Sequence, residues 1–355
     1  MYQVMIHPAT YETVRDSVDR AFDRFPQDLA GKKVLIKPNV LRASDSDEGI
    51  ATHPSVLAAV VDKVQSLAPA ALVVGDNPGL FSYGANEAAF RQTGLMDAAR
   101  GCYRNIGLDA VAAPFHTDFM ETVRISRAVV EADIIISLPK FKTHGLTVMT
   151  GAIKNSYGIL PGAQKARLHK IAGTPARFHE LIVEVFKLRV PDLFIVDAVV
   201  GMEGNGPASP DLRQIGCILA ADNAVALDAV IATMMGLDPG RLRFLQCAAD
   251  AGLGSWLMAD ILVDGELKAI EDFKVPPLGG EAILSNPAIQ ELLESKTRLM
   301  PRPDPDDCTG CGTCVDQCPA QALSMMDNLP QVDMASCVTC FCCQEICPEK
   351  AMVLQ

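Results

Sequence analysis

The amino-acid sequence predicts an α/β protein in which a mostly parallel sheet carries helices on both faces, followed by a small C-terminal α+β domain. Three observations lead to this prediction. Strand-like and helix-like patterns alternate from residue 1 to about residue 285, which is typical of an α/β sheet. The segment Asp133–Leu138 is largely apolar, as expected for a strand covered on both faces. Beyond residue 305 the chain becomes rich in cysteine and acidic residues.

The individual elements follow from the local patterns. Short apolar runs that end at polar or turn residues are predicted as strands, at Gln3–Ile6, Lys33–Lys37, Ala71–Val74, Asp133–Leu138, Leu193–Val196, Cys217–Ala220 and Ile261–Asp264. Segments with helical periodicity are predicted as helices, at Thr10–Arg24, Pro54–Leu67, Asn86–Arg100, Ala176–Leu188 and Val225–Met235.

The domain boundaries are expected near residues 285 and 305. A helical pattern from Asn286 to Lys296 is followed by a proline-rich stretch, residues 301–305, which we interpret as a semi-rigid linker. We therefore expect an α/β domain at 1–285, a helix and linker at 286–305, and a small domain at 306–355. A stiff linker favours a small domain held in a defined position against the large one.

The composition indicates a folded protein without a membrane span. The chain is 49% hydrophobic and 21% charged, which suits a large apolar core. The N-terminal residues have no basic region followed by an apolar stretch, so we expect no secretory signal and a cytoplasmic location. The most apolar long segment, residues 215–237, contains Asp222, Asn223 and Asp228, which would be costly in a bilayer.

Charge is concentrated at the C-terminal end. The net charge is −12, and residues 301–355 contribute −6 of it. An acidic segment of this density repels nucleic acid and favours a partner protein with a basic docking face. A solvated acidic surface without a partner is an equally good interpretation.

The cysteines form two copies of one motif. Nine of the 12 cysteines lie within residues 308–347, and a Cys-x2-Cys-x2-Cys-x3-Cys-Pro run occurs twice, offset by 29 residues. The ligands it provides are Cys308, Cys311, Cys314, Cys318, Cys337, Cys340, Cys343 and Cys347. This spacing is typical of [4Fe–4S] ligation, whereas zinc modules pair Cys-x2-Cys arms across a longer gap. The sequence therefore predicts two [4Fe–4S] clusters and one-electron transfer.

The tandem motif resembles bacterial two-cluster ferredoxins. That resemblance implies a ferredoxin-like α+β domain in which the fourth cysteine of each run binds the other cluster. One cluster is then held by Cys308, Cys311, Cys314 and Cys347, and the other by Cys337, Cys340, Cys343 and Cys318. Cys342 lies outside the register, so we expect it to be a bystander rather than a ligand.

Polar residues follow four of the predicted strands. Ligands of open α/β sheets bind beyond the carboxyl ends of the strands, so these residues are candidates for a binding site. They are Lys37, Asn39, Asp76, Asn77, Lys140, Lys142, His144 and Asp197. His53, before a predicted helix, is interpreted equally well as a cap or as a site residue.

The basic residues among them suggest an anion site. Lys140, Lys142 and His144 alternate, so an extended chain would place them on one side. Lys154 and Asn155 follow after small residues and precede two glycines, which expose backbone amides. The alternative is a solvated lysine-rich loop. The chain has no P-loop motif and no ordered dinucleotide fingerprint.

Several of these segments resemble the domain-of-unknown-function 362 family. They are Lys37-Pro-Asn39, Thr52-His-Pro54, Gly75-Asp-Asn-Pro78, Leu138-Pro-Lys-Phe-Lys-Thr-His144 and Gly151-Ala-Ile-Lys-Asn155 with Gly158. The resemblance covers about 1–285, and family members often carry a ferredoxin-type tail. A fainter similarity, through His144 and Lys154, is to the lactate racemase-like family, in which such residues hold a pyridinium-type cofactor.

Three functions are consistent with these features. The first is an iron–sulfur oxidoreductase in which Lys140, His144 and Lys154 are catalytic, and the other polar residues bind a small anionic substrate or cofactor. The second is an electron carrier or adaptor that docks a separate enzyme. The third is a maturation factor whose crevice holds a metal or cofactor destined for another protein.

Overall fold

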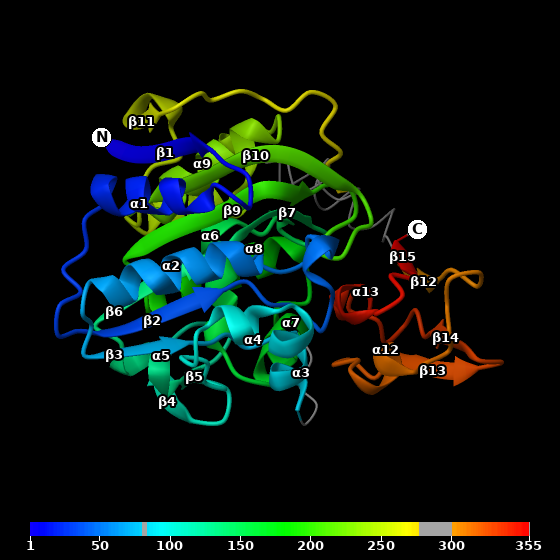
Figure 1. Cartoon of the computed structure of the whole chain (residues 1–355). Coiled ribbons are helices and arrows are strands. Elements are labelled where there is room, and N and C mark those ends of the chain that lie inside the picture. Colours follow the sequence, from blue (N-terminus) through cyan, green and yellow to red (C-terminus); the bar gives the residue numbers. More distant parts are fainter. Residues whose placement is uncertain (80–83, 277–299, 355) are drawn as a thin grey trace.

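The computed structural model describes residues 1–79, 84–276 and 300–354, and it has a central sheet of nine strands (Figure 1). The strands are β1 (Tyr2–Pro8), β2 (Lys33–Pro38), β3 (Ala71–Val74), β6 (Ile134–Leu138), β7 (Lys140–His144), β8 (Val148–Met149), β9 (Leu193–Met202), β10 (Leu212–Ala221) and β11 (Ile261–Asp264). Their order is β11-β1-β10-β9-β6-β2-β3, with β7 pairing β8 and β9.

Most strand pairs in this sheet are parallel, as predicted. The pairs β1/β11, β9/β6, β6/β2, β2/β3 and β7/β9 are parallel, whereas β1/β10, β9/β10 and β7/β8 are antiparallel. The antiparallel pair β9/β10 arises because the loop between the two strands, residues 203–211, is too short for a crossover. The fold is therefore α/β, with β10 reversed within the sheet.

Helices cover both faces of the sheet (Figure 1). One layer contains α1 (Val14–Arg24), α2 (Pro54–Ser66), α3 (Ala85–Gln92) and α4 (Leu95–Ala98). The other contains α6 (Gly151–Asn155), α7 (Gln164–Ala172), α8 (Pro175–Leu188), α9 (Ala224–Met234) and α10 (Arg243–Asp250). No helix in the described ranges is both long and apolar enough to cross a bilayer.

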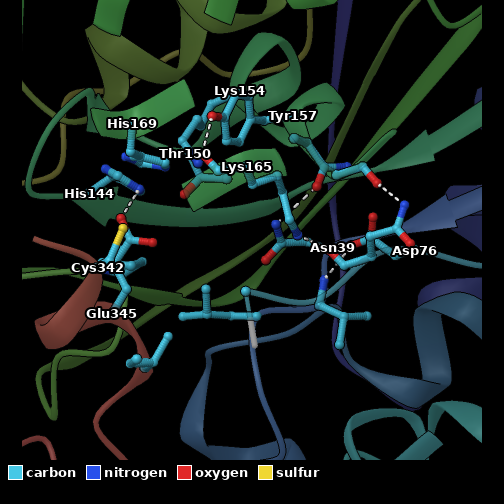
Figure 2. Close-up of a pocket in the computed structure, with 18 of the residues that line it drawn as sticks. Asn39, Asp76, His144, Thr150, Lys154, Tyr157, Lys165, His169, Cys342 and Glu345 are labelled. Atoms are coloured by element: carbon cyan, nitrogen blue, oxygen red, sulfur yellow. Dashed lines mark hydrogen bonds and ion pairs between the residues drawn. The ribbon is translucent and has the colours of Figure 1, made fainter. Parts of the chain in front are cut away.

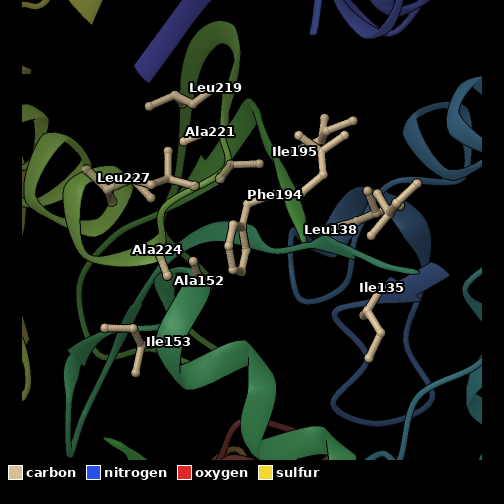
Figure 3. Close-up of a cluster of buried hydrophobic side chains, with 14 of the residues drawn as sticks. Ile135, Leu138, Ala152, Ile153, Phe194, Ile195, Leu219, Ala221, Ala224 and Leu227 are labelled. Atoms are coloured by element: carbon tan, nitrogen blue, oxygen red, sulfur yellow. The ribbon is translucent and has the colours of Figure 1, made fainter. Parts of the chain in front are cut away.

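The core covers both faces of the sheet, and one part of it lies between the sheet and the second helix layer. Figure 3 shows Phe194 of β9 packed near Ala152 of α6 and Ala224 of α9. All three are at most 2% exposed. Small side chains on the two helices let them approach each other and the sheet closely. This packing fixes the position of α6, which carries two of the predicted site residues.

The predicted and observed elements do not correspond everywhere. The predicted helix Asn86–Arg100 is interrupted at Gly94, whose φ of +75° lies outside the helical region. The hairpin β4 (Ala110–Pro114) and β5 (Thr122–Ser126), followed by α5 (Arg127–Glu131), was not predicted. The predicted helix from Asn286 to Lys296 lies outside the described residues.

The C-terminal module is small and packs against the α/β domain. It contains β12 (Pro301–Pro303), α12 (Thr313–Asp316), β13 (Leu323–Met326), β14 (Leu329–Val332), α13 (Cys342–Ile346) and β15 (Met352–Leu354). The contact is through α13 (Figure 1). Phe341, just before α13, is 3% exposed and belongs to the main core. Lys350 forms an ion pair with Glu48 of the large domain at 3.1 Å.

Asp228 of α9 fixes the start of α6. Its carboxylate accepts hydrogen bonds from the backbone N–H groups of Ala152 at 2.6 Å and Ile153 at 3.0 Å. Gly151 has a φ of +57°, and a Cβ there would lie 2.4 Å from Asp228 Oδ1. The close approach of this carboxylate therefore requires glycine, and it sets the direction in which α6 projects its side chains.

We expect Gly151→Ala to destabilise the protein more than Gly162→Ala. Both glycines have a left-handed φ, +57° and +54°, so both variants incur a backbone cost of about 1–2 kcal/mol. Only residue 151 would also clash with a carboxylate, since no atom lies within 4 Å of a Cβ at residue 162. The crowding should add about 1–3 kcal/mol. Thermal unfolding of the two variants measures the difference, and equal midpoints would contradict this account of α6.

Candidate functional site

A cavity lies between the carboxyl ends of β2 and β3 and helix α13 of the C-terminal module (Figure 2). Its empty volume is about 750 Å³, including the space at its mouth. One wall is formed by the α/β domain, and the other by Gln317, Cys342, Glu345 and Ile346 of the module. The cavity therefore exists only where the two parts of the chain meet.

Three lysines line this cavity: Lys142 from β7, Lys154 from α6 and Lys165 from α7. Lys142 Nζ donates a hydrogen bond to the Ile50 carbonyl at 2.6 Å, and Lys165 Nζ donates to backbone carbonyls of the loop after β3. Lys154 Nζ lies over the Tyr157 ring, 5.1 Å from its centroid. Among the described residues, none of the three forms an ion pair with a carboxylate.

The pKa values of these lysines reflect their burial and the positive charge of their neighbours. Burial, together with the charge of Lys154, lowers the pKa of Lys142 to about 7. Burial likewise lowers the pKa of Lys165 to about 7, and it lowers the pKa of Lys154. A negative charge entering the cavity would favour the protonated ammonium groups and raise these pKa values again.

The end of the cavity next to the sheet is polar but carries no net charge. Lys37 Nζ forms an ion pair with Asp76 Oδ1 at 2.6 Å, and both side chains are almost fully buried. Asp76 Oδ2 also accepts the backbone N–H of Val40 at 3.0 Å. Asn39 Nδ2 donates to Asn155 Oδ1 at 2.9 Å. The side chains of Asn39, Asp76 and Asn155 line the cavity, and Asn77 lines it beside them.

His144 contacts the C-terminal module across the cavity (Figure 2). Its Nδ1 accepts the backbone N–H of Leu146 at 3.1 Å, and its Nε2 lies 3.0 Å from Glu345 Oε1. Burial lowers the pKa of His144 to about 4, so the ring is neutral near pH 7. With Nδ1 as an acceptor, the proton of the neutral ring is on Nε2, the nitrogen that lies near Glu345.

Four buried polar atoms of the cavity wall have neither a hydrogen-bond partner nor an ion pair among the described residues. They are the acceptors Asn39 Oδ1 and Asn77 Oδ1, and Thr150 Oγ1 and His169 Nδ1, which can donate. The His169 ring stacks on Phe178 with centroids 4.2 Å apart, and burial lowers its pKa to about 3. An unpaired polar atom in such a place is costly, so these atoms are candidates for contacts with a ligand.

Three of the predicted site residues lie in a different cluster. Lys140 Nζ pairs with Asp197 Oδ2 at 2.7 Å, and both residues are fully buried. The His53 backbone N–H donates to Asp197 at 2.8 Å, and the His53 ring stacks on Tyr11. His53 is also the N-cap of α2, with Nδ1 accepting the N–H of Ser55. None of these residues lines the cavity, so the expectation of one shared crevice does not hold for them.

The four cysteines that are predicted to bind the first cluster surround a separate cavity. Cys308, Cys311, Cys314 and Cys347 line it together, although Cys347 comes from the second run. Gly310 and Gly312, with φ of +70° and +76°, let the loop curve around this space. Four thiols around one cavity fit a cubane cluster with the ligand set that we expected.

In the second set of cysteines, the three other members lie near Cys343. Burial raises the pKa of the Cys343 thiol well above its usual value, and the nearby thiols of Cys340, Cys337 and Cys318 raise it further. Cys342 and Gln317, which are the immediate chain neighbours of Cys343 and Cys318, line the lysine cavity. The second set of cysteines is therefore adjacent to that cavity.

Several cavity residues were not predicted as part of a site, and the ionisable ones among them include Lys165, His169, Cys342 and Glu345. Lys165 and His169 are four residues apart, and Cys342 and Glu345 are three apart. On a helix, such spacing places the two side chains of each pair on one face. Glu345 was not separable from the general acidity of the module. Its role depends on a contact with His144, about 200 residues away in the chain, which no local pattern encodes.

Comparison with known proteins gives the family. A family described as "Domain of unknown function (DUF362)" matches residues 34–233, and a "4Fe-4S dicluster domain" matches residues 300–348. The chain belongs to the DUF362 family. It carries an iron–sulfur cluster-binding domain at its C-terminal end.

Two curated relatives are similar to parts of this DUF362 protein. A thylakoid-associated protein of Synechocystis sp. is 34% identical over 231 residues, which covers 63% of this chain and 69% of that protein. A probable ferredoxin of Methanosarcina thermophila is 65% identical over 23 residues, covering 6% of this chain and 40% of that protein.

The structural comparison is more distant. A crystal structure of a protein from Thermotoga maritima has a TM-score of 0.39 at 12% identity, covering 69% of this chain and 60% of that one. A likeness at this level carries no argument about function.

We expect Lys140→Met to destabilise the protein without acting on the cavity. The variant leaves the Asp197 carboxylate buried without its counter-charge, which typically costs about 3–5 kcal/mol. The double variant Lys140→Met/Asp197→Leu removes both charges and should recover part of that loss. Thermal unfolding of the single and double variants measures this. A Lys140→Met variant as stable as the parent protein would contradict a structural role.

Proposed function

We propose that this protein is an iron–sulfur oxidoreductase that passes electrons through two [4Fe–4S] clusters to a small anionic substrate or cofactor in the lysine cavity. One observation carries the proposal. The cavity is lined on one side by three lysines without a carboxylate partner, and on the other by Cys342 and Gln317, beside two predicted ligands of the second cluster. A ligand in this cavity would lie close to the place where electrons leave the module.

The cavity residues would have different roles. Lys142, Lys154 and Lys165 would bind the anionic part of the ligand, and Asn39, Asn77 and Asn155 its uncharged polar part. Lys142, with a pKa of about 7, is suited to donate a proton at neutral pH when the ligand accepts an electron. His144 would position Glu345 and so hold the module against the cavity. Lys140 has no role in this proposal, because it is paired with Asp197 elsewhere.

The protein purified without oxygen should contain about eight irons and eight sulfides per chain, as expected from two cubanes. Metal analysis and the electron paramagnetic resonance spectrum of the reduced protein measure this. Cys311→Ser should remove or alter one cluster and leave the spectrum of the other. A zinc content of two per chain, or an iron content near two, would contradict the two-cluster assignment.

Oxidation of the reduced protein by added compounds tests the enzyme proposal. A panel of small carboxylates, keto acids and phosphate esters should contain a compound that reoxidises the reduced clusters, and Lys165→Met should slow that reaction at least tenfold. Lys32→Met is the matched control, because Lys32 is exposed at the amino end of β2, opposite the cavity. Equal rates in both variants would show that reoxidation does not use the cavity.

We also propose that a reducing partner with a basic face docks near the first cluster site. Cys311 is exposed, and Asp306 and Asp307 are exposed beside Cys308. Opposite charges steer such an encounter and speed it at low salt. The exposed methionines Met325 and Met326 of β13 offer an apolar contact on the same module. These features also favour the second candidate, an electron carrier that serves a separate enzyme.

The methyl viologen radical cation is a simple probe of this acidic face. Its rate of reduction of the protein should fall as ionic strength rises, and Asp306→Asn/Asp307→Asn should lower the rate at low salt. Asp16→Asn/Asp23→Asn, exposed on α1 of the large domain, is the control with the same change in net charge. Stopped-flow absorbance measures the rates. If both double variants lowered the rate equally, the effect would be one of net charge alone, and the proposed docking face would be wrong.

We also propose a cytoplasmic location. None of the twelve cysteines forms a disulfide, which suits a reducing compartment. The Synechocystis relative is described as thylakoid-associated.

A further inference from the structure

We propose that the lysine cavity is built for a small dianion: a dicarboxylate or a phosphate monoester. This inference rests on the proposed function for the choice of cavity, and it adds the charge and the chemical class of the ligand. It follows from the charge count in the cavity wall and from the unpaired polar atoms there.

In their ammonium forms, the lysines at the cavity exceed the carboxylates there by two positive charges. Lys142, Lys154 and Lys165 contribute three ammonium groups when protonated, and Glu345 is the carboxylate that faces them. Lys37 and Asp76 also line or adjoin the cavity, but they cancel each other at 2.6 Å. A ligand with two negative charges would balance these side chains, and the negative charge of the second cluster would lie behind Cys342.

The other ionisable side chains near these lysines are paired or neutral. Lys140 is paired with Asp197, and Arg42 shares the Glu48 carboxylate with Lys350, at 3.5 Å and 3.1 Å. His144 and His169 are neutral near pH 7, because burial lowers their pKa values to about 4 and about 3. Among the side chains of the cavity wall, the excess is therefore carried by the three lysines.

Two of the four unpaired groups in the wall can donate a hydrogen bond to oxygen atoms of a ligand. Thr150 Oγ1 and His169 Nδ1 are buried, line the cavity and have no hydrogen-bond partner in the part of the chain that the structure describes. The hydroxyl can donate to an oxyanion, and so can the imidazole when its proton is on Nδ1. Together with the ammonium groups they provide donors for the several oxygens of a carboxylate or phosphate.

The pKa values of the lysines predict that ligand binding is coupled to proton uptake. At pH 8, lysines with a pKa of about 7 are roughly nine-tenths neutral. A dianion that stabilises the ammonium forms of Lys142 and Lys165 will take up protons from the solution as it binds. The expected uptake is more than one and up to about two protons per chain.

Isothermal titration calorimetry on the oxidised, cluster-loaded full-length protein tests the inference. At pH 8 and low ionic strength, succinate and inorganic phosphate are titrated in two buffers of different ionisation enthalpy, and acetate serves as the monoanion control. We expect at least one dianion to bind tenfold or more tightly than acetate, with net proton uptake. Succinate and phosphate separate the dicarboxylate from the phosphate ester.

Two variants locate the binding. Lys165→Met should weaken binding of the dianion at least tenfold and reduce the proton uptake, whereas Lys32→Met should change neither. Binding of acetate as tight as that of both dianions, binding without proton uptake, or equal binding to Lys165→Met would overturn the inference.

The outcome is separable from the proposed function, because calorimetry requires no electron transfer. If neither dianion binds, but an uncharged compound reoxidises the reduced clusters in a Lys165-dependent reaction, then the ligand is not a dianion and the redox proposal stands. If a dianion binds with proton uptake, but no compound reoxidises the clusters, the dianion site stands and the oxidoreductase proposal is wrong.

Discussion

The contact of helix α13 with the α/β domain is the constraint on which the rest of the site depends. Phe341 anchors the helix by inserting into the main core, and Glu345 faces His144 at 3.0 Å. Without this contact the lysines of β7, α6 and α7 would line an open rim at the end of the sheet. With it, the rim becomes a cavity, and the lysines face the part of the module that holds the second set of cysteines.

Burying the cavity lysines without an ion-pair partner costs free energy. Among the described residues, none of these lysines forms a direct ion pair with a carboxylate, and burial lowers the pKa of each. The neighbouring Lys37–Asp76 and Lys140–Asp197 pairs show that the same sheet edge can neutralise buried lysines when their charge is not needed. Lys142, Lys154 and Lys165 are therefore the lysines whose charge is available to a ligand.

The sequence was informative where the pattern is local, and it was not where a contact joins distant segments. Seven strands of the central sheet, the cysteine motif and the polar residues after β2 and β3 could be predicted from periodicity and spacing. Lys140 and Lys142 could not be separated in this way, because alternation places them on the same side. The register of β7 against β9 shifts between them, so Lys140 lies opposite Asp197 while Lys142 reaches the cavity. Glu345 and Lys165 became site residues only through packing of the module on the domain.

A redox titration followed by electron paramagnetic resonance tests the central claim, that the lysine cavity faces one of two clusters. At pH 6, where Lys165 carries its charge, Lys165→Met removes a positive charge from the cavity wall. A reduced cluster nearby then loses a stabilising interaction. The account predicts that the midpoint potential of one cluster falls while that of the other is unchanged, and that Lys32→Met shifts neither. Two unchanged potentials in Lys165→Met would contradict the placement of the cavity beside a cluster.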